Sequence, residues 1–177
     1  MYKEISKGTS ISTVYKFADV DGRIVKLLEQ GEKIDDVVKQ FRDLLVGVRR
    51  VEGNVFLNEG INFIWRAITG DTSLTYFKDN SCIGVGDGTT SPDPSQTGLT
   101  GTNKTYKQVD SGYPQITDTK ITFRASFGPD EANHAWQEWT VANGCDDSAI
   151  NINRRQENLG VKSSGSTWVL EVTLSIT

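Results

Sequence analysis

Two segments near the C-terminal end alternate strictly between apolar and polar residues, and this pattern constrains the fold more than any other feature. The segments are KITFRASF, residues 120–127, and TWVLEVTLSI, residues 167–176. A period of two is typical of a β-strand with one buried face and one solvent-exposed face. AWQEWTV and AININ are further candidate strands, and the dipeptide Asn143-Gly144 predicts a tight turn. We therefore predict an antiparallel β-sandwich, jelly-roll-like, over residues 71–177.

The preceding residues carry a helical period instead. In IDDVVKQFRDLLVGV, residues 34–48, the apolar residues recur at the 3.6-residue spacing of an amphipathic helix. A second apolar face runs through NVFLNEGINFIWRAITG, residues 54–70, and Gly60 inside it predicts close packing against another element. The expected fold class is α+β, with a helical region over residues 21–70 that precedes the β-sandwich.

The first 20 residues show no continuous apolar face. Terminal segments of this kind are poorly ordered unless a partner holds them. We therefore expect an N-terminal arm over residues 1–20 that becomes ordered against a partner. Its aromatic residues Tyr2, Tyr15 and Phe17 are candidate interface residues.

The segment CIGVGDGTTSPDPSQTGLTG, residues 82–101, raises the question of a nucleotide site. Its glycines are spaced GxGxG, whereas a dinucleotide fingerprint needs GxGxxG at the start of a helix. Pro92 and Pro94 disfavour a helix here, and the GK pair of a phosphate-binding loop does not occur in the sequence. We therefore predict a strand over residues 81–85 that runs into a long connection, and no cofactor.

The residue types that most often carry chemistry are few. His134 is the only histidine, and the two cysteines, Cys82 and Cys145, are 63 positions apart without a CxxC pair. A Cys145–His134 nucleophile pair is conceivable across a turn, but no third orienting group forms a motif with it. One disulfide is possible, although reduced and buried cysteines are the default expectation. We predict no catalytic residue and no metal site, and hence no enzyme.

Trp136 and Trp139 are three positions apart in a candidate strand and should therefore point to opposite faces. One would fill the core. The other would lie at an interface, beneath a loop, or in a sugar-binding platform. Both are candidate interface residues.

The overall charge narrows the classes of partner. The net charge is −4 and the isoelectric point is about 5.0, whereas nucleic-acid-binding domains are usually basic. No apolar run approaches the ~20 residues of a membrane helix, and the first residues contain no apolar core of a signal peptide. We expect neither a nucleic-acid partner nor a membrane partner.

Several segments together resemble a known group of proteins. FLNEGINFIWRAITG, CIGVGDGTTSPDPSQTGLTGTNK, SGYPQITDTKITFRASFGPDEANHAWQEWTVANG and NRRQENLGVKSSGSTWVLEVTLSIT are similar to small virion structural proteins of tailed bacteriophages, over about residues 54–177. The shared features are an N-x-G-[IL]-N helix, an I-x-VG-x-GTT-x-P loop and a final β-hairpin. These are turn and packing motifs, and no catalytic residues come with them.

The resemblance implies a non-enzymatic capsid decoration (cement) protein that binds and stabilises the assembled head. Its partner would be the major capsid protein, and a homo-oligomer, with a trimer favoured, would give several weak contacts at once. The protein would be made in the host cytoplasm and located in the virion. Two alternatives remain open: a tail, neck or baseplate protein of the same virion, and a carbohydrate-binding β-sandwich for host adsorption.

Overall fold

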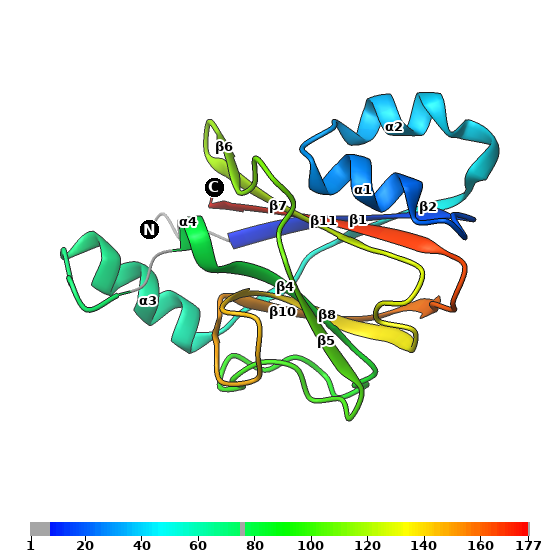
Figure 1. Ribbon diagram of the computed structural model, residues 1–177. Helices are drawn as coiled ribbons and strands as arrows, with labels where there is room; N and C mark the ends of the chain where they lie inside the picture. The colour runs from blue at the N-terminus through cyan, green and yellow to red at the C-terminus, as the bar shows by residue number, and fades with distance from the viewer. Residues whose placement is uncertain (1–7, 75–76, 177) are drawn as a thin grey trace, which may run out of the picture.

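The computed structural model describes residues 8–74 and 77–176, and within them the chain forms two stacked antiparallel β-sheets (Figure 1). The first sheet has the strand order β2-β1-β11-β7-β6. Its strands are β1 (Gly8–Phe17), β2 (Leu45–Glu52), β6 (Gln115–Thr117), β7 (Lys120–Phe127) and β11 (Thr167–Ile176).

The second sheet has the order β3-β10-β8-β4-β5, with the short strand β9 paired to β8. Its strands are β3 (Val55–Phe56), β4 (Ser81–Gly86), β5 (Lys104–Gln108), β8 (Ala135–Asn143), β9 (Ile150–Asn151) and β10 (Asn153–Val161). The helices are α1 (Arg23–Glu29), α2 (Ile34–Gln40), η1 (Arg42–Leu44), α3 (Asn58–Ile68) and α4 (Phe77–Asn80), where η1 is a single 3₁₀ turn.

The main core lies between the two sheets. Aromatic rings dominate it: the Trp136 ring contacts those of Phe127 and Trp168 edge to face, at centroid distances of 4.9 and 5.0 Å. Such edge-to-face pairs add stability beyond the area that they bury.

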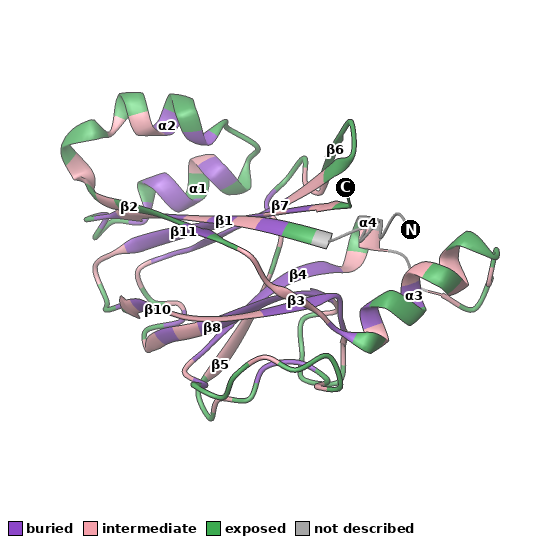
Figure 2. Ribbon diagram, turned by 180° about the vertical axis from the view of Figure 1, so that it is seen from behind, coloured by how far each residue is buried: buried purple, intermediate pink, exposed green. Residues whose placement is uncertain are grey.

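A second, smaller core lies on the outer face of the first sheet. Helix α1 packs there through Ile24 and Leu28 against Phe17 and Val169, all fully buried (Figure 2). The buried Asp19 carboxylate accepts hydrogen bonds from the backbone N–H groups of the first two residues of α1, at 3.0 Å each. These bonds satisfy donors that a helix start leaves unpaired, and they fix α1 to the end of β1.

The predicted order, helices first and then strands, is not what the structure has. Residues 8–17 of the expected arm form β1, which pairs with β2 on one side and β11 on the other. The sequence pattern does not indicate this strand, because its core-facing positions include Ser10 and Ser12, which break the alternation of apolar and polar residues. The Trp139 indole N–H donates to the Ser12 hydroxyl oxygen at 2.9 Å, so a polar residue suits this buried position.

The predicted helix over residues 34–48 is also shorter than expected. It ends at Gln40, and the chain enters β2 at Leu45 after a 3₁₀ turn. The β-branched residues of this segment favour a strand, and pairing with β1 satisfies its backbone groups. Several apolar residues of the expected helical face still pack on the second core, although they come from three elements.

The two alternating segments were predicted correctly, since β7 spans residues 120–127 and β11 spans residues 167–176. Their second face is not fully solvent-exposed, because Arg124, Ser126 and Val169 on it are buried on the side of α1. The expected final hairpin is wrong: β10 pairs with β8 and β3, whereas β11 pairs with β1 and β7. The turn at residues 162–166 therefore crosses between the sheets.

Helix α3 confirms the interpretation of Gly60. A Cβ atom at this position would lie 2.5 Å from the Cα atom of Ile152, so only glycine permits the helix to approach so closely. The Glu59 carboxylate also accepts a hydrogen bond from the Asn151 backbone N–H at 2.7 Å. Much of the rest of α3 is exposed (Figure 2). No helix among the described residues is long and apolar enough to cross a membrane.

Candidate functional site

The long connection after β4 is held by one buried carboxylate. Glu138, on the outer face of β8, accepts hydrogen bonds from the backbone N–H groups of Gly88, Thr100 and Gly101, at 3.1, 2.9 and 2.7 Å. The two ends of the connection therefore meet at a single side chain. This is a backbone-clamping arrangement, in which the N–H groups satisfy a protein carboxylate.

Arg154 on β10 completes the clamp. Its Nε donates to Glu138 at 2.7 Å, and both side chains are fully buried. Its other nitrogens donate to the side-chain oxygen of Gln96, the carbonyl of Thr90 and the hydroxyl of Thr100, each at 2.9 Å. One guanidinium thus fixes three points along residues 90–100.

The glycines of the GxGxG segment are explained by packing. A Cβ atom at Gly84 would lie 2.5 Å from the Tyr106 ring, and one at Gly88 would overlap the Glu138 carboxylate. One at Gly101 would overlap the Asp87 carboxylate. The prediction that β4 runs into a long connection is confirmed, because β4 spans residues 81–86 and β5 begins at Lys104.

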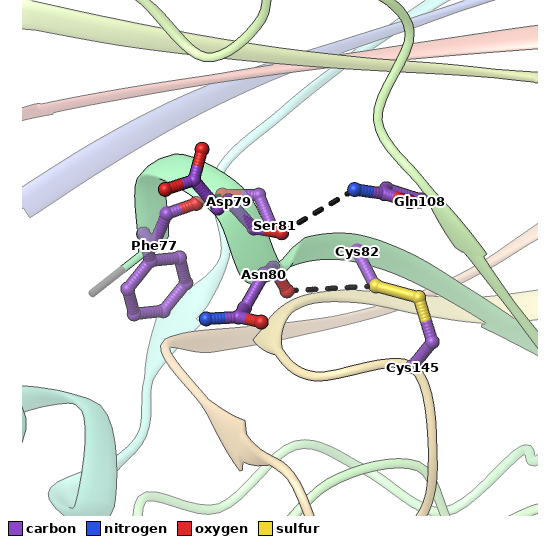
Figure 3. The surroundings of a disulfide bond; sticks show 7 residues. All are labelled: Phe77, Asp79, Asn80, Ser81, Cys82, Gln108 and Cys145. Atoms are coloured by element: carbon purple, nitrogen blue, oxygen red, sulfur yellow. Dashed lines mark hydrogen bonds between the residues drawn. A yellow bond between two sulfur atoms is a disulfide. The ribbon is translucent and has the colours of Figure 1, made fainter. Parts of the chain in front are cut away.

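A disulfide joins Cys82 and Cys145 (Figure 3). It links the start of β4 to the loop that follows β8, across 63 positions of sequence. The expectation of reduced cysteines is therefore wrong. The pairing of β4 with β8 sets Cys82 opposite Ala142, so the loop after β8 brings the Cα atom of Cys145 to 5.4 Å from that of Cys82, within disulfide range. Beside it, the Gln108 amide donates to the Asp79 carbonyl oxygen at 3.3 Å.

The disulfide also removes the Cys145–His134 nucleophile pair, since neither cysteine is a thiol. The His134 ring instead lies within hydrogen-bond distance of the Thr105 hydroxyl and the Ala135 carbonyl oxygen, at 3.1 and 2.9 Å. Within residues 8–74 and 77–176, no group of three His, Cys, Asp or Glu side chains could hold a metal ion.

Both candidate tryptophans are buried in the main core, so the expectation that one lies at an interface is wrong. Since the two rings share one core although they are three positions apart, β8 does not alternate regularly between them, and its pairing with β10 is irregular at this point, between Gln156 and Gly160. The indole of Trp136 donates to the Ala132 carbonyl oxygen at 3.0 Å. Neither ring can therefore serve as an exposed sugar platform.

The other candidate interface residues have different positions. Phe17 is fully buried in the second core, where it packs under α1, so its interface role is also wrong. Tyr15 is half-buried at the edge of the same core. Tyr2 lies outside the described residues.

A polar cavity lies next to Tyr15, on the outer face of the first sheet. It encloses about 380 Å³ between the α1–α2 connection and strands β1, β11 and β7. The Tyr113 hydroxyl donates to the Glu171 carboxylate at 3.2 Å, and the Arg124 guanidinium stacks on the Tyr113 ring at 4.6 Å. Sequence patterns missed this site because its residues come from distant strands and follow no motif.

The electrostatics of this cavity follow from burial. Desolvation raises the pKa of Glu171, and the nearby Asp35 carboxylate adds to this effect. Burial also raises the pKa values of Tyr15 and Tyr113 to about 12, so both phenols remain protonated at neutral pH.

Arg124 is held by Asp110 and by the Leu28 carbonyl oxygen, at 2.7 and 2.9 Å, while its second terminal nitrogen has no hydrogen-bond partner in the protein. The cavity thus offers both donors and acceptors.

No protein-family model, curated protein or solved structure matches the chain in comparisons with known proteins.

Proposed function

We propose that this chain is a non-enzymatic structural protein of a tailed-bacteriophage virion, most specifically a capsid decoration protein that binds the major capsid protein of the assembled head. The observation that carries the proposal is the clamp of Glu138 and Arg154. The fold uses this fully buried ion pair to fix a 17-residue connection, residues 87–103, against the outer face of a sheet. Such side chains hold a surface rigid and do not act on a substrate.

Three further observations support this function. The resemblance to virion structural proteins covers about residues 54–177, which include the clamped connection. The Cys82–Cys145 disulfide suits a protein that functions in oxidising surroundings, where a released particle is found. A rigid protein that binds only the assembled lattice stabilises it by mass action.

The test is to express the chain with and without the major capsid protein of its phage and to count copies on purified particles by imaging. Saturable binding at regular lattice positions, with many copies per shell, would support a decoration protein. A few copies at one vertex or on the tail would instead support the alternative of a tail, neck or baseplate protein. Complete particles that carry no copy on the shell, at a vertex or on the tail would contradict both.

The polar cavity favours a second candidate function, which is saccharide binding for host adsorption. A sugar presents hydroxyl groups that both donate and accept, and Glu171, Tyr15 and Tyr113 line the cavity with matching groups. A volume of about 380 Å³ falls within the size range of small-molecule sites. This basis differs from the tryptophan platform, which the buried rings exclude.

A glycan array tests this candidate. Glu171→Gln and Tyr113→Phe should both weaken glycan binding, whereas Glu52→Gln, at an exposed site on β2, should leave it unchanged. This result would support saccharide binding in the cavity. Binding that does not respond to the two cavity variants, or no binding to any glycan, would contradict it.

A further inference from the structure

Among the residues that the structure describes, most of the exposed large apolar side chains lie at one end of the molecule. Ile61, Trp65 and Ile68 lie along α3, and their side chains are 37%, 61% and 69% exposed. Ile116 on β6 and Ile176 at the end of β11 are 78% and 59% exposed. Figure 1 shows α3, β6 and the end of β11 on the same side of the two sheets. We call these five residues the apolar end.

The three residues on α3 form a stripe. Their spacing of four and then three positions puts them on one helical face. That face is turned away from Gly60 and Phe63, the two buried residues by which α3 attaches to the body. The sequence predicts this apolar face correctly, but the structure leaves it without a cover among the described residues.

An apolar groove adjoins the stripe. It encloses about 470 Å³, and Ile64 of α3 and Phe56 line it together with Ile116 and Ile176. The floor comes from Ile121, Ile152 and Leu174, which belong to or border the main core. A ridge of apolar side chains and an apolar groove are thus next to each other, so one copy of this surface can receive the ridge of another.

The exposed apolar area of these five side chains can be compared with the apolar area that a stable protein interface buries. A large aromatic or aliphatic side chain can bury on the order of 100–250 Å², so five that are exposed by a third to three quarters present several hundred Å². One side of a standard protein interface buries about 800 Å², of which roughly 60% is apolar. The apolar end therefore supplies about the apolar area that one side of a stable dimer requires.

The charges around the apolar end permit contact between identical surfaces. Arg66 is paired with Asp71 at 2.8 Å, and Asp118 and Lys120 at the groove have opposite signs. The chain as a whole has a net charge of −4, which would oppose self-association through an acidic face. The near-balanced charge here avoids this repulsion.

We propose that the apolar end is the contact by which copies of this chain associate, with the α3 stripe of one copy packed into the groove of the next. In a two-fold dimer, the stripe and the groove of both copies are buried in a single interface, and this dimer is the oligomer proposed. The inference goes beyond the proposed virion function and does not depend on it, because it concerns the free protein.

Trp65 makes the contact directly measurable. The chain has four tryptophans, and the other three, Trp136, Trp139 and Trp168, are at most 6% exposed. Acrylamide quenching therefore reports almost entirely on Trp65. We expect quenching to increase as the protein is diluted, in parallel with a fall in mass towards 19.5 kDa by analytical ultracentrifugation.

Two variants and one control complete the test. Trp65→Asp and Ile116→Asp, one on each side of the contact, should each give a folded monomer, with folding checked by circular dichroism. Val20→Asp is the matched control, because Val20 is 73% exposed but lies outside the apolar end, next to Gly165. It should associate like the original protein.

Three outcomes would overturn the proposal. The first is a protein that is monomeric at every concentration. The second is an oligomer that both apolar-end variants leave intact. The third is an oligomer that Val20→Asp dissociates as completely as the apolar-end variants do. In the first case, protection of Trp65 from quenching by added capsids would show that the shell covers this end. That last result would leave the proposed virion function standing.

Discussion

Arg154 donates to Glu138 at 2.7 Å across two neighbouring strands, and neither side chain has any exposed surface. The carboxylate also accepts three backbone N–H groups, and the guanidinium donates to three further oxygens. Because their hydrogen-bonding capacity is largely satisfied, two charges can remain away from water in this fold. The clamp holds a segment that has almost no regular secondary structure of its own.

Replacing Arg154 by methionine should destabilise the protein strongly, because Glu138 would remain buried without its cation. The expected loss is about 3–5 kcal/mol of unfolding free energy, measured by denaturant titration. Limited proteolysis should also cut more rapidly within residues 87–103. Arg50→Met is the control, since it breaks an exposed pair with Glu52 and should cost less than about 1 kcal/mol. A similar loss in both variants would contradict the assigned role of the clamp.

Opening the disulfide should lower stability without removing a core side chain. The Cys82–Cys145 bond spans 63 positions, and chain-entropy arguments assign a loop of this length about 4 kcal/mol. Thermal unfolding with and without a reductant measures this effect. The double variant Cys82→Ser/Cys145→Ser should match the reduced protein and should not respond to reductant. An unfolding midpoint that reductant leaves unchanged in the original protein would contradict the disulfide.

The glycines of residues 84–88 are expected to be required for packing. Gly84→Ala would push a methyl group against the Tyr106 ring and should cost about 1–3 kcal/mol. Gly47→Ala in β2 is the matched control, because no atom lies within 4 Å of its new Cβ. It should change stability by no more than about 0.5 kcal/mol. Equal effects at the two positions would show that the packing at Gly84 is looser than described.

The buried Glu171 carboxyl should make the free energy of unfolding depend on pH, in a direction that follows from its raised pKa. Burial raises the pKa of this carboxyl in the folded protein above its ordinary value of 4.5, so the folded state binds the proton more tightly than the unfolded chain. The contribution to stability is complete below pH 4.5 and is lost as the pH rises through the folded value. Glu171→Gln cannot ionise, so we expect it to gain stability relative to the original protein between acidic and neutral pH.

Denaturant midpoints of Glu171→Gln and the original protein, measured across this pH range, test the prediction. A stability difference between Glu171→Gln and the original protein that does not change with pH would show that the carboxyl is not perturbed by its surroundings.

Local sequence patterns determined the elements whose side chains contrast clearly along the chain. Strands β7 and β11 follow from strict alternation, because one face of each packs in the core and repeats every second residue. The close approach of α3 was visible in Gly60, since a glycine inside a helix is unfavourable without a packing reason. These features depend on neighbours in sequence, and one chain is enough to show them.

Only the tertiary structure decided the rest. Strand β1 carries serines at core-facing positions, and Ser12 is suitable there because the Trp139 indole reaches it from the opposite sheet. The two tryptophans lie in one core although they are three positions apart, and the disulfide depends on the pairing of β4 with β8, strands that are far apart in the sequence. The clamp, the polar cavity and the apolar end likewise combine residues from distant elements. These features are stabilised by contacts between segments that are far apart in the sequence. Local sequence patterns describe only neighbouring residues, so they do not reveal such contacts.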